Sequence, residues 1–225
     1  ATEDALVLDG LTYTFPVGGA TVMVGDNTDI SALYTGACAY TAFTDYAGNC
    51  GTGNSLGLGG EGATAAMSYA FDSGFSLAGG ISSTPDSILT EDGADTFGME
   101  AAYTADSWGV AVAYSDIESS GATFWGVNGM YAFDFATLSV GVESENPDAG
   151  DTGTGFFVGL SFPEVGAGSF DLSVGTTGNF ADGDTEYYAY EASYAYPVND
   201  GMTITPGVAY IEGSESEEGD ITVFA

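Results

Sequence analysis

The acidic side chains with the clearest positional pattern are Glu100, Glu143, Asp171 and Glu191. Each lies in a stretch of alternating residues, among Ser, Gly and Ala, opposite the aromatic and aliphatic positions. Carboxylates on the water-facing side of such stretches would create a negative potential that favours cations over anions. They could instead serve only to keep that side hydrated, and the sequence leaves both interpretations open.

Other chemistry is sparse. The chain has 33 Asp and Glu but no Lys, Arg or His, so the usual proton shuttles and amine nucleophiles are missing. Paired carboxylates alone can cleave glycosides, but the acids here gather mainly between the alternating stretches. Two cysteines without histidine cannot complete a zinc site, and residues 182–186 do not complete an EF-hand-type calcium loop. We expect no enzymatic activity, no cofactor and no metal centre.

The composition excludes several classes of protein. Mean hydropathy is +0.12 and aromatic residues make up 13%, which is too apolar for a disordered acidic tail. The net charge of -33 makes nucleic acid a very poor partner, because no side chain can replace phosphate counterions. The missing bases indicate either an acidic pore selected in a high-salt habitat or a sequence that is incomplete at basic positions.

The alternating stretches come in pairs joined by short turns. A short turn makes the two strands of a pair antiparallel neighbours. Longer acidic connections, such as 26–60, 83–95 and 212–219, separate the pairs. This regular sorting is typical of membrane-spanning β-barrels, although any single pair would also fit a soluble sandwich. The predicted pairs are 11–15 with 22–24, 63–71 with 75–81, 97–103 with 108–114, 125–133 with 138–142, 156–162 with 170–174, and 188–196 with 202–208.

These pairs predict an all-β, antiparallel, up-and-down transmembrane β-barrel. With a last segment at 220–224 there are about 13 strands, and the first runs from the long-loop side to a short turn. A closed bacterial barrel has an even strand number. We therefore expect at least one strand before residue 1, and a chain that is part of a larger protein.

Four stretches resemble a known family. They are DGLTYTFPVGGATVMVGDNTDI, YTADSWGVAVAY, SFPEVGAGSFDLSVG and YEASYAYPVNDGMTITPGV. They are similar to the barrel of cyanobacterial outer-membrane porins of the Som type, which are related to carbohydrate-porin-like barrels. The resemblance covers most of the chain, although the family normally contains Lys and Arg and ends in an aromatic residue, whereas this chain has no bases and ends Phe224-Ala225.

The resemblance implies a barrel of 16 strands when complete, of which residues 1–225 form the barrel domain with about 13 strands, in a homotrimer among the lipids of a cyanobacterial outer membrane. It also implies a preceding S-layer-homology domain, outside this sequence, that grips peptidoglycan-linked polymer. If three strands precede residue 1, the segment 25–62 follows the fifth strand, where such barrels fold a constriction loop inward. Asp26, Asp29 and Asp45 would add negative charge there.

The same segment holds the only two cysteines, Cys38 and Cys50. Their spacing would close a small loop, and a compartment outside the cytoplasm permits a disulfide. We expect this bridge, with two free thiols as the alternative.

The leading functional hypothesis is a passive diffusion channel for ions and small hydrophilic solutes, carbohydrates included, that favours cations. The alternative is a structural barrel that anchors the outer membrane to the cell wall, or a component of an extracellular assembly. A soluble acidic β-protein comes third.

Overall fold

The protein is one antiparallel β-sheet in this computed structural model, which describes residues 10–59, 62–83, 94–213 and 219–224. Of its 15 strands two lie off the main path, which leaves 13 in a continuous up-and-down order. The 13 are β1 (Leu11–Val17), β2 (Ala20–Asp26), β3 (Ala63–Ala70), β4 (Phe75–Ser83), β5 (Asp95–Thr104), β6 (Trp108–Ile117), β7 (Ala122–Ala132), β8 (Thr137–Pro147), β9 (Gly153–Val165), β10 (Gly168–Thr176), β12 (Tyr188–Asn199), β14 (Gly207–Ile211) and β15 (Asp220–Phe224).

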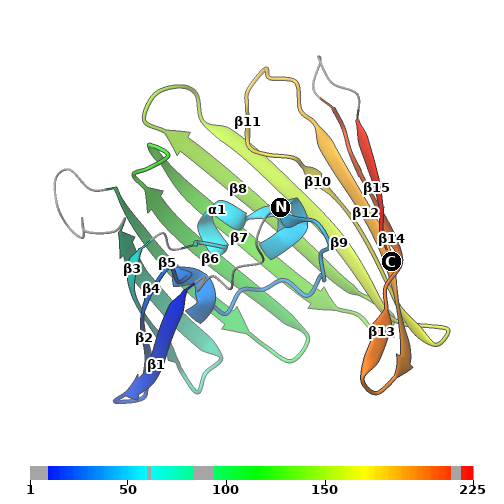
Figure 1. Ribbon diagram of the computed structural model, residues 1–225, viewed down its shortest axis with the longest axis horizontal. Coiled ribbons are helices and arrows are strands. Elements are labelled where there is room, and N and C mark those ends of the chain that lie inside the picture. Colours follow the sequence, from blue (N-terminus) through cyan, green and yellow to red (C-terminus); the bar gives the residue numbers. More distant parts are fainter. Residues whose placement is uncertain (1–9, 60–61, 84–93, 214–218, 225) are drawn as a thin grey trace, which may run out of the picture.

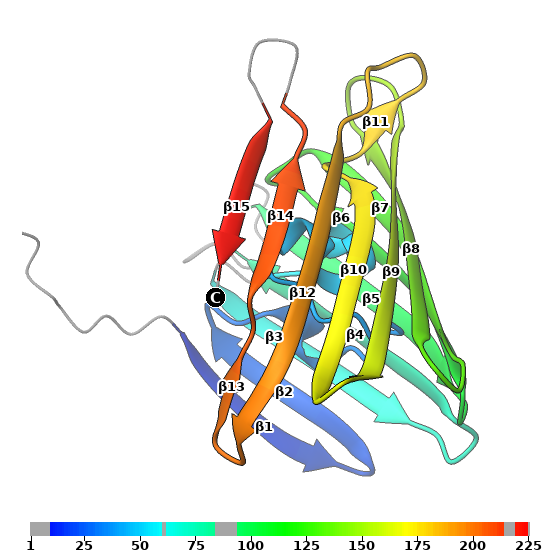
Figure 2. The ribbon, with the colours of Figure 1, turned by 90° about the vertical axis from the view of Figure 1, so that its right-hand side faces the viewer.

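The sheet is strongly curved, as the two perpendicular views show (Figure 1 and Figure 2). Each strand on the path pairs with the next, so the predicted all-β, antiparallel, up-and-down fold is confirmed. The two edges are β1 and β15, and the described residues show no pairing between them. The two strands off the path are short: β11 (Phe180–Ala181) pairs with β9, and β13 (Met202–Ile204) pairs with β12.

The six predicted hairpins are all present. Between β3 and β4 the turn is closed by a hydrogen bond from Phe71 N to Phe75 O, at 2.8 Å. Gly74 takes a φ of +89°, which a residue with a Cβ would adopt only with strain. The long connections expected at 83–95 and 212–219 fall mainly on 84–93 and 214–218, outside the described residues.

Side chains alternate along the strands between an outer apolar face and an inner face of small or polar residues. Met67, Met99 and Val127 are among the exposed outer residues. Ala113 and Ser139 are among the buried inner ones. Among the described residues, none of the helices is long and apolar enough to cross a membrane.

The buried core lies on the concave face of the sheet, under the connection between β2 and β3. This connection contains three short helices, η1 (Ile30–Leu33), η2 (Asp45–Gly51) and α1 (Gly53–Leu56). In Figure 1 its blue and cyan ribbon lies within the curve of the sheet rather than beyond the strand ends. We call residues 27–59 the inward segment.

Candidate functional site: an inward segment held by the sheet

The inward segment crosses the concave face twice, in opposite directions. We call residues 30–44 the outbound leg and residues 45–59 the return leg. The outbound leg meets, in order, Gly80 of β4, Glu100 of β5, Asn128 of β7, Ser139 of β8, Phe157 of β9 and Glu191 of β12. The return leg meets Phe157 of β9, Gly141 and Glu143 of β8, Gly126 of β7, Ser115 of β6 and Gly98 of β5.

Inward-facing glycines let the return leg approach the sheet closely. At three of them an added Cβ would overlap the return leg, so a side chain of the leg or, at Gly141, its backbone would have to move. The added Cβ would lie 2.2 Å from Leu58 Cδ1 at Gly98, 1.8 Å from Ser55 Oγ at Gly126, and 2.0 Å from the Cys50 carbonyl oxygen at Gly141.

Two buried glutamates hold the outbound leg, one in its first half and one at its end. Glu100 accepts hydrogen bonds from the backbone N–H groups of Thr35 and Gly36, at 2.7 and 2.9 Å. Glu191 accepts from the backbone N–H groups of Phe43 and Thr44, both at 2.9 Å. A buried carboxylate needs such partners, because an uncompensated charge in an apolar setting is costly.

A third glutamate holds the return leg. Glu143 is only 1% exposed, and one of its oxygens accepts from the backbone N–H groups of Asn54 and Ser55 and from the Ser55 hydroxyl. Its other oxygen accepts from the side-chain amides of Asn54 and Asn179, at 2.8 and 3.1 Å. The carboxylate is therefore fully occupied by neutral donors.

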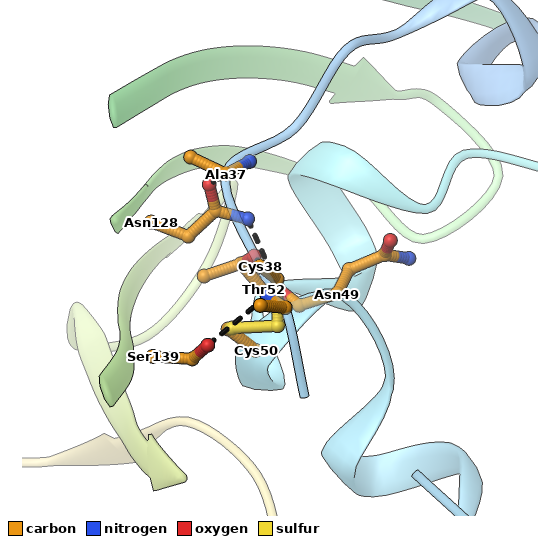
Figure 3. The surroundings of a disulfide bond; sticks show 8 residues. Ala37, Cys38, Asn49, Cys50, Thr52, Asn128 and Ser139 are labelled. Atoms are coloured by element: carbon orange, nitrogen blue, oxygen red, sulfur yellow. Dashed lines mark hydrogen bonds between the residues drawn. A yellow bond between two sulfur atoms is a disulfide. The ribbon is translucent and has the colours of Figure 1, made fainter. Parts of the chain in front are cut away.

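The predicted disulfide is confirmed, and it joins the two legs. Cys38 of the outbound leg is bonded to Cys50 of the return leg, with Cα atoms 5.8 Å apart. On the sheet side Asn128 accepts from the N–H of Ala37, and Ser139 accepts from the N–H of Ala39 (Figure 3). The bridge therefore sits over β7 and β8, with both neighbours of Cys38 tied to the sheet.

Backbone strain is concentrated beside the bridge. Asn49 and Cys50 have φ values of 50° and 55°, in the left-handed region that residues with a Cβ rarely adopt. Such conformations persist only where their surroundings hold them. Here the disulfide, the glycine at 141 and a hydrogen bond from Asn128 Nδ2 to the Asn49 carbonyl hold this turn.

Two tyrosines of the outbound leg remain neutral beside the carboxylates. Burial raises the pKa of Tyr40 above its usual value, and its hydrogen bond to Glu191, 2.9 Å long, raises the pKa further. Burial is also the main cause of the raised pKa of Tyr34, with the charge of Glu100 as a second cause. Both phenols therefore remain protonated across the physiological pH range.

The fourth predicted pore-lining acid has a different setting. Asp171 of β10 borders a cavity of about 270 Å³, together with Thr41 of the outbound leg and Ser161 of β9. An adjacent cavity of about 550 Å³, next to the turn that follows β9, shares Pro163 and Ser169 with it. In the described part of the chain no hydrogen bond joins Asp171 to the inward segment.

The three acids predicted for the constriction loop are dispersed. Asp26 is the last residue of β2, in the exposed row of Val24 rather than the row of buried Met23. Asp29 is exposed just before η1. Asp45 begins η2, and its side chain lies outside the described part of the structure. The three acids therefore do not form one group on the outbound leg.

Several residues that hold the inward segment were not predicted. Asn128 and Ser139 bond to the outbound leg and Asn179 supports Glu143; all three are neutral, and their partners lie far away in the sequence. The sequence feature that could have indicated a covering segment is the set of glycines at inward positions of the strands, since these positions leave room for another backbone.

A sequence profile of the Gram-negative porin family matches residues 10–216. Among solved structures, a single-tryptophan mutant of the porin of Rhodopseudomonas blastica matches with a TM-score of 0.64 and 18% identity, over 99% of this chain and 78% of that chain. A triple mutant of the same porin matches with a TM-score of 0.65 and 16% identity, over the same shares. At such identities the structural likeness concerns the fold. Comparison with curated proteins gives no match.

Proposed function

Because the chain belongs to the Gram-negative porin family, we propose that it forms a diffusion channel that favours cations over anions. Membership of this family makes it a channel of a bacterial outer membrane rather than an enzyme. The cation preference and the solutes are the proposed part. The solutes are ions and small hydrophilic molecules, sugars among them.

The observation that carries the cation preference is the position of Asp171. It borders a cavity between the outbound leg and the sheet, and no N–H of the inward segment is bonded to it in the described residues. The sequence has no cationic side chain that could offset this charge. A carboxylate at a water-filled constriction raises the local concentration of cations and lowers that of anions.

The inward segment supplies the narrowing in this proposal. It occupies the concave face from β4 to β12, so a solute passes between this segment and the remaining inner surface. The predicted constriction over residues 25–62 would then consist of the two legs and the residues that flank them.

The test is the reversal potential of the purified protein in a planar bilayer under a salt gradient. Asp171→Asn should move the reversal potential toward zero, because one carboxylate at the narrow part is lost. Asp72→Asn is the matched control, since it removes the same charge from an exposed turn between β3 and β4. An anion preference of the unmodified protein, or an unchanged potential in Asp171→Asn, would contradict the proposal. A protein that does not conduct but still attaches to the envelope would favour the anchoring barrel.

The resemblance supports two finer assignments, which we also propose. The channel is of the cyanobacterial Som type, and it assembles as a homotrimer. Mass measurement of the detergent-solubilised protein tests the trimer.

A further inference from the structure

Glu100 and Glu191 share one feature that a general lumenal charge would not need. In each, the two carboxylate oxygens accept from the N–H groups of two consecutive residues, Thr35 with Gly36 and Phe43 with Thr44. Both side chains are 3% exposed. Their charges are therefore directed at backbone rather than at water.

This geometry requires two adjacent acceptors, which only an ionised carboxylate provides. An amide of the same shape offers one oxygen and one NH2 group, so one backbone N–H would face another donor. Hydrogen bonds to an ionised acceptor are also stronger than those to a neutral one. The need for two adjacent acceptors explains why glutamate occupies positions 100 and 191, and it involves no contact with a permeating ion.

We infer that Glu100 and Glu191 are positioning residues, which clamp the outbound leg at two points and thereby fix the width of the channel. The effect on conductance rests on the proposed function, whereas the clamping itself does not. Between the two clamped pairs the leg is also held by the neutral acceptors Asn128 and Ser139, by the disulfide to Cys50, and by the hydrogen bond from Tyr40 to Glu191. Loss of either clamp should free the residues bonded to it while the sheet stays intact.

Glu143 provides an internal comparison. Both backbone N–H groups bonded to it share one oxygen, and its other oxygen faces the amides of Asn54 and Asn179. In Glu143→Gln the amide oxygen can keep the backbone donors, and the two asparagine amides can flip to accept from the new NH2 group. This variant should therefore be milder than Glu100→Gln or Glu191→Gln.

The direct test is amide hydrogen exchange of the full chain in detergent, followed residue by residue. Glu100→Gln should speed exchange at Thr35 and Gly36 by about tenfold or more, and leave Phe43 and Thr44 protected. Glu191→Gln should give the reverse pattern. Unchanged protection at the clamped pair, or equal loss at both pairs, would overturn the inference. This measurement does not depend on conduction.

Single-channel recording separates clamping from charge. Glu100→Gln and Glu191→Gln should change the conductance and raise the open-channel noise, with a smaller shift of the reversal potential than Asp171→Asn. A reversal potential shifted as far as in Asp171→Asn, with conductance and noise unchanged, would make them lumenal charges and overturn the inference. If the unmodified protein does not conduct, the proposed function fails, and the exchange experiment still decides the clamps.

Discussion

At the scale of single residues, the buried acids show how a chain without cations can keep carboxylates inside. No described carboxylate can pair with Lys, Arg or His, because the sequence has none. Glu100, Glu143 and Glu191 are stabilised instead by backbone N–H groups, side-chain amides and hydroxyls. Several neutral donors that converge on one carboxylate replace the hydrogen bonds to water that it loses on burial.

Gly141 gives a test of the close approach between the return leg and β8. Gly141→Ala would place a methyl group 2.0 Å from the Cys50 carbonyl oxygen, so the strained turn must move. We expect a loss of about 1–3 kcal/mol in the stability of the attached segment, seen as faster proteolysis of residues 45–59.

The control for this change is Gly129→Ala in β7. There the nearest atom, the Gly109 carbonyl oxygen, would lie 3.3 Å from the new methyl group, so only a small adjustment is needed. Equal proteolysis in the two variants would show that the contact at Gly141 is unimportant.

At the scale of elements, the disulfide closes residues 38–50 into a ring that carries the Glu191 clamp at its far end. Replacing both cysteines by serine should cost about 3 kcal/mol of loop constraint. The ring should then be cleaved faster by a protease specific for aromatic residues, while the melting of the sheet changes little. Thr41→Ser, inside the same ring, is the control. Equal cleavage rates in the double variant and the unmodified protein would contradict a role for the bridge.

The sequence was sufficient to predict the hairpins because each depends on local alternation and on a short turn. The predicted strand over 202–208 is an exception, since it is divided into β13 and β14 around Pro206. Proline lacks the N–H that a continuous strand would donate, and its carbonyl accepts from Tyr194 N instead.

The partners of the predicted inward-facing acids were beyond prediction for a different reason. Glu100 lies 65 residues from Thr35, and Glu191 lies 148 residues from Phe43. Alternation gives the face of the sheet to which each glutamate belongs, but not the segment that covers it. The sequence therefore predicted acids on the inner face and could not distinguish a free charge from a clamped one.

At the scale of the whole molecule, a net charge of -33 makes self-repulsion a general cost of the folded state. Salt shortens the range of this repulsion, from about 10 Å at 0.1 M to about 3 Å at 1 M. We expect the melting temperature in a neutral detergent to rise with added NaCl. KCl at equal concentration should act alike, because screening depends on ionic strength. A melting temperature that stays flat or falls would show that the acids are already well compensated.

The inward segment also has a mechanical consequence for the sheet. Its attachments extend from β4 to β12, and the disulfide prevents the two legs from sliding past one another. The part of the sheet from β4 to β12 cannot flatten without breaking those attachments. The inward segment therefore acts as an internal brace that keeps this part of the sheet curved.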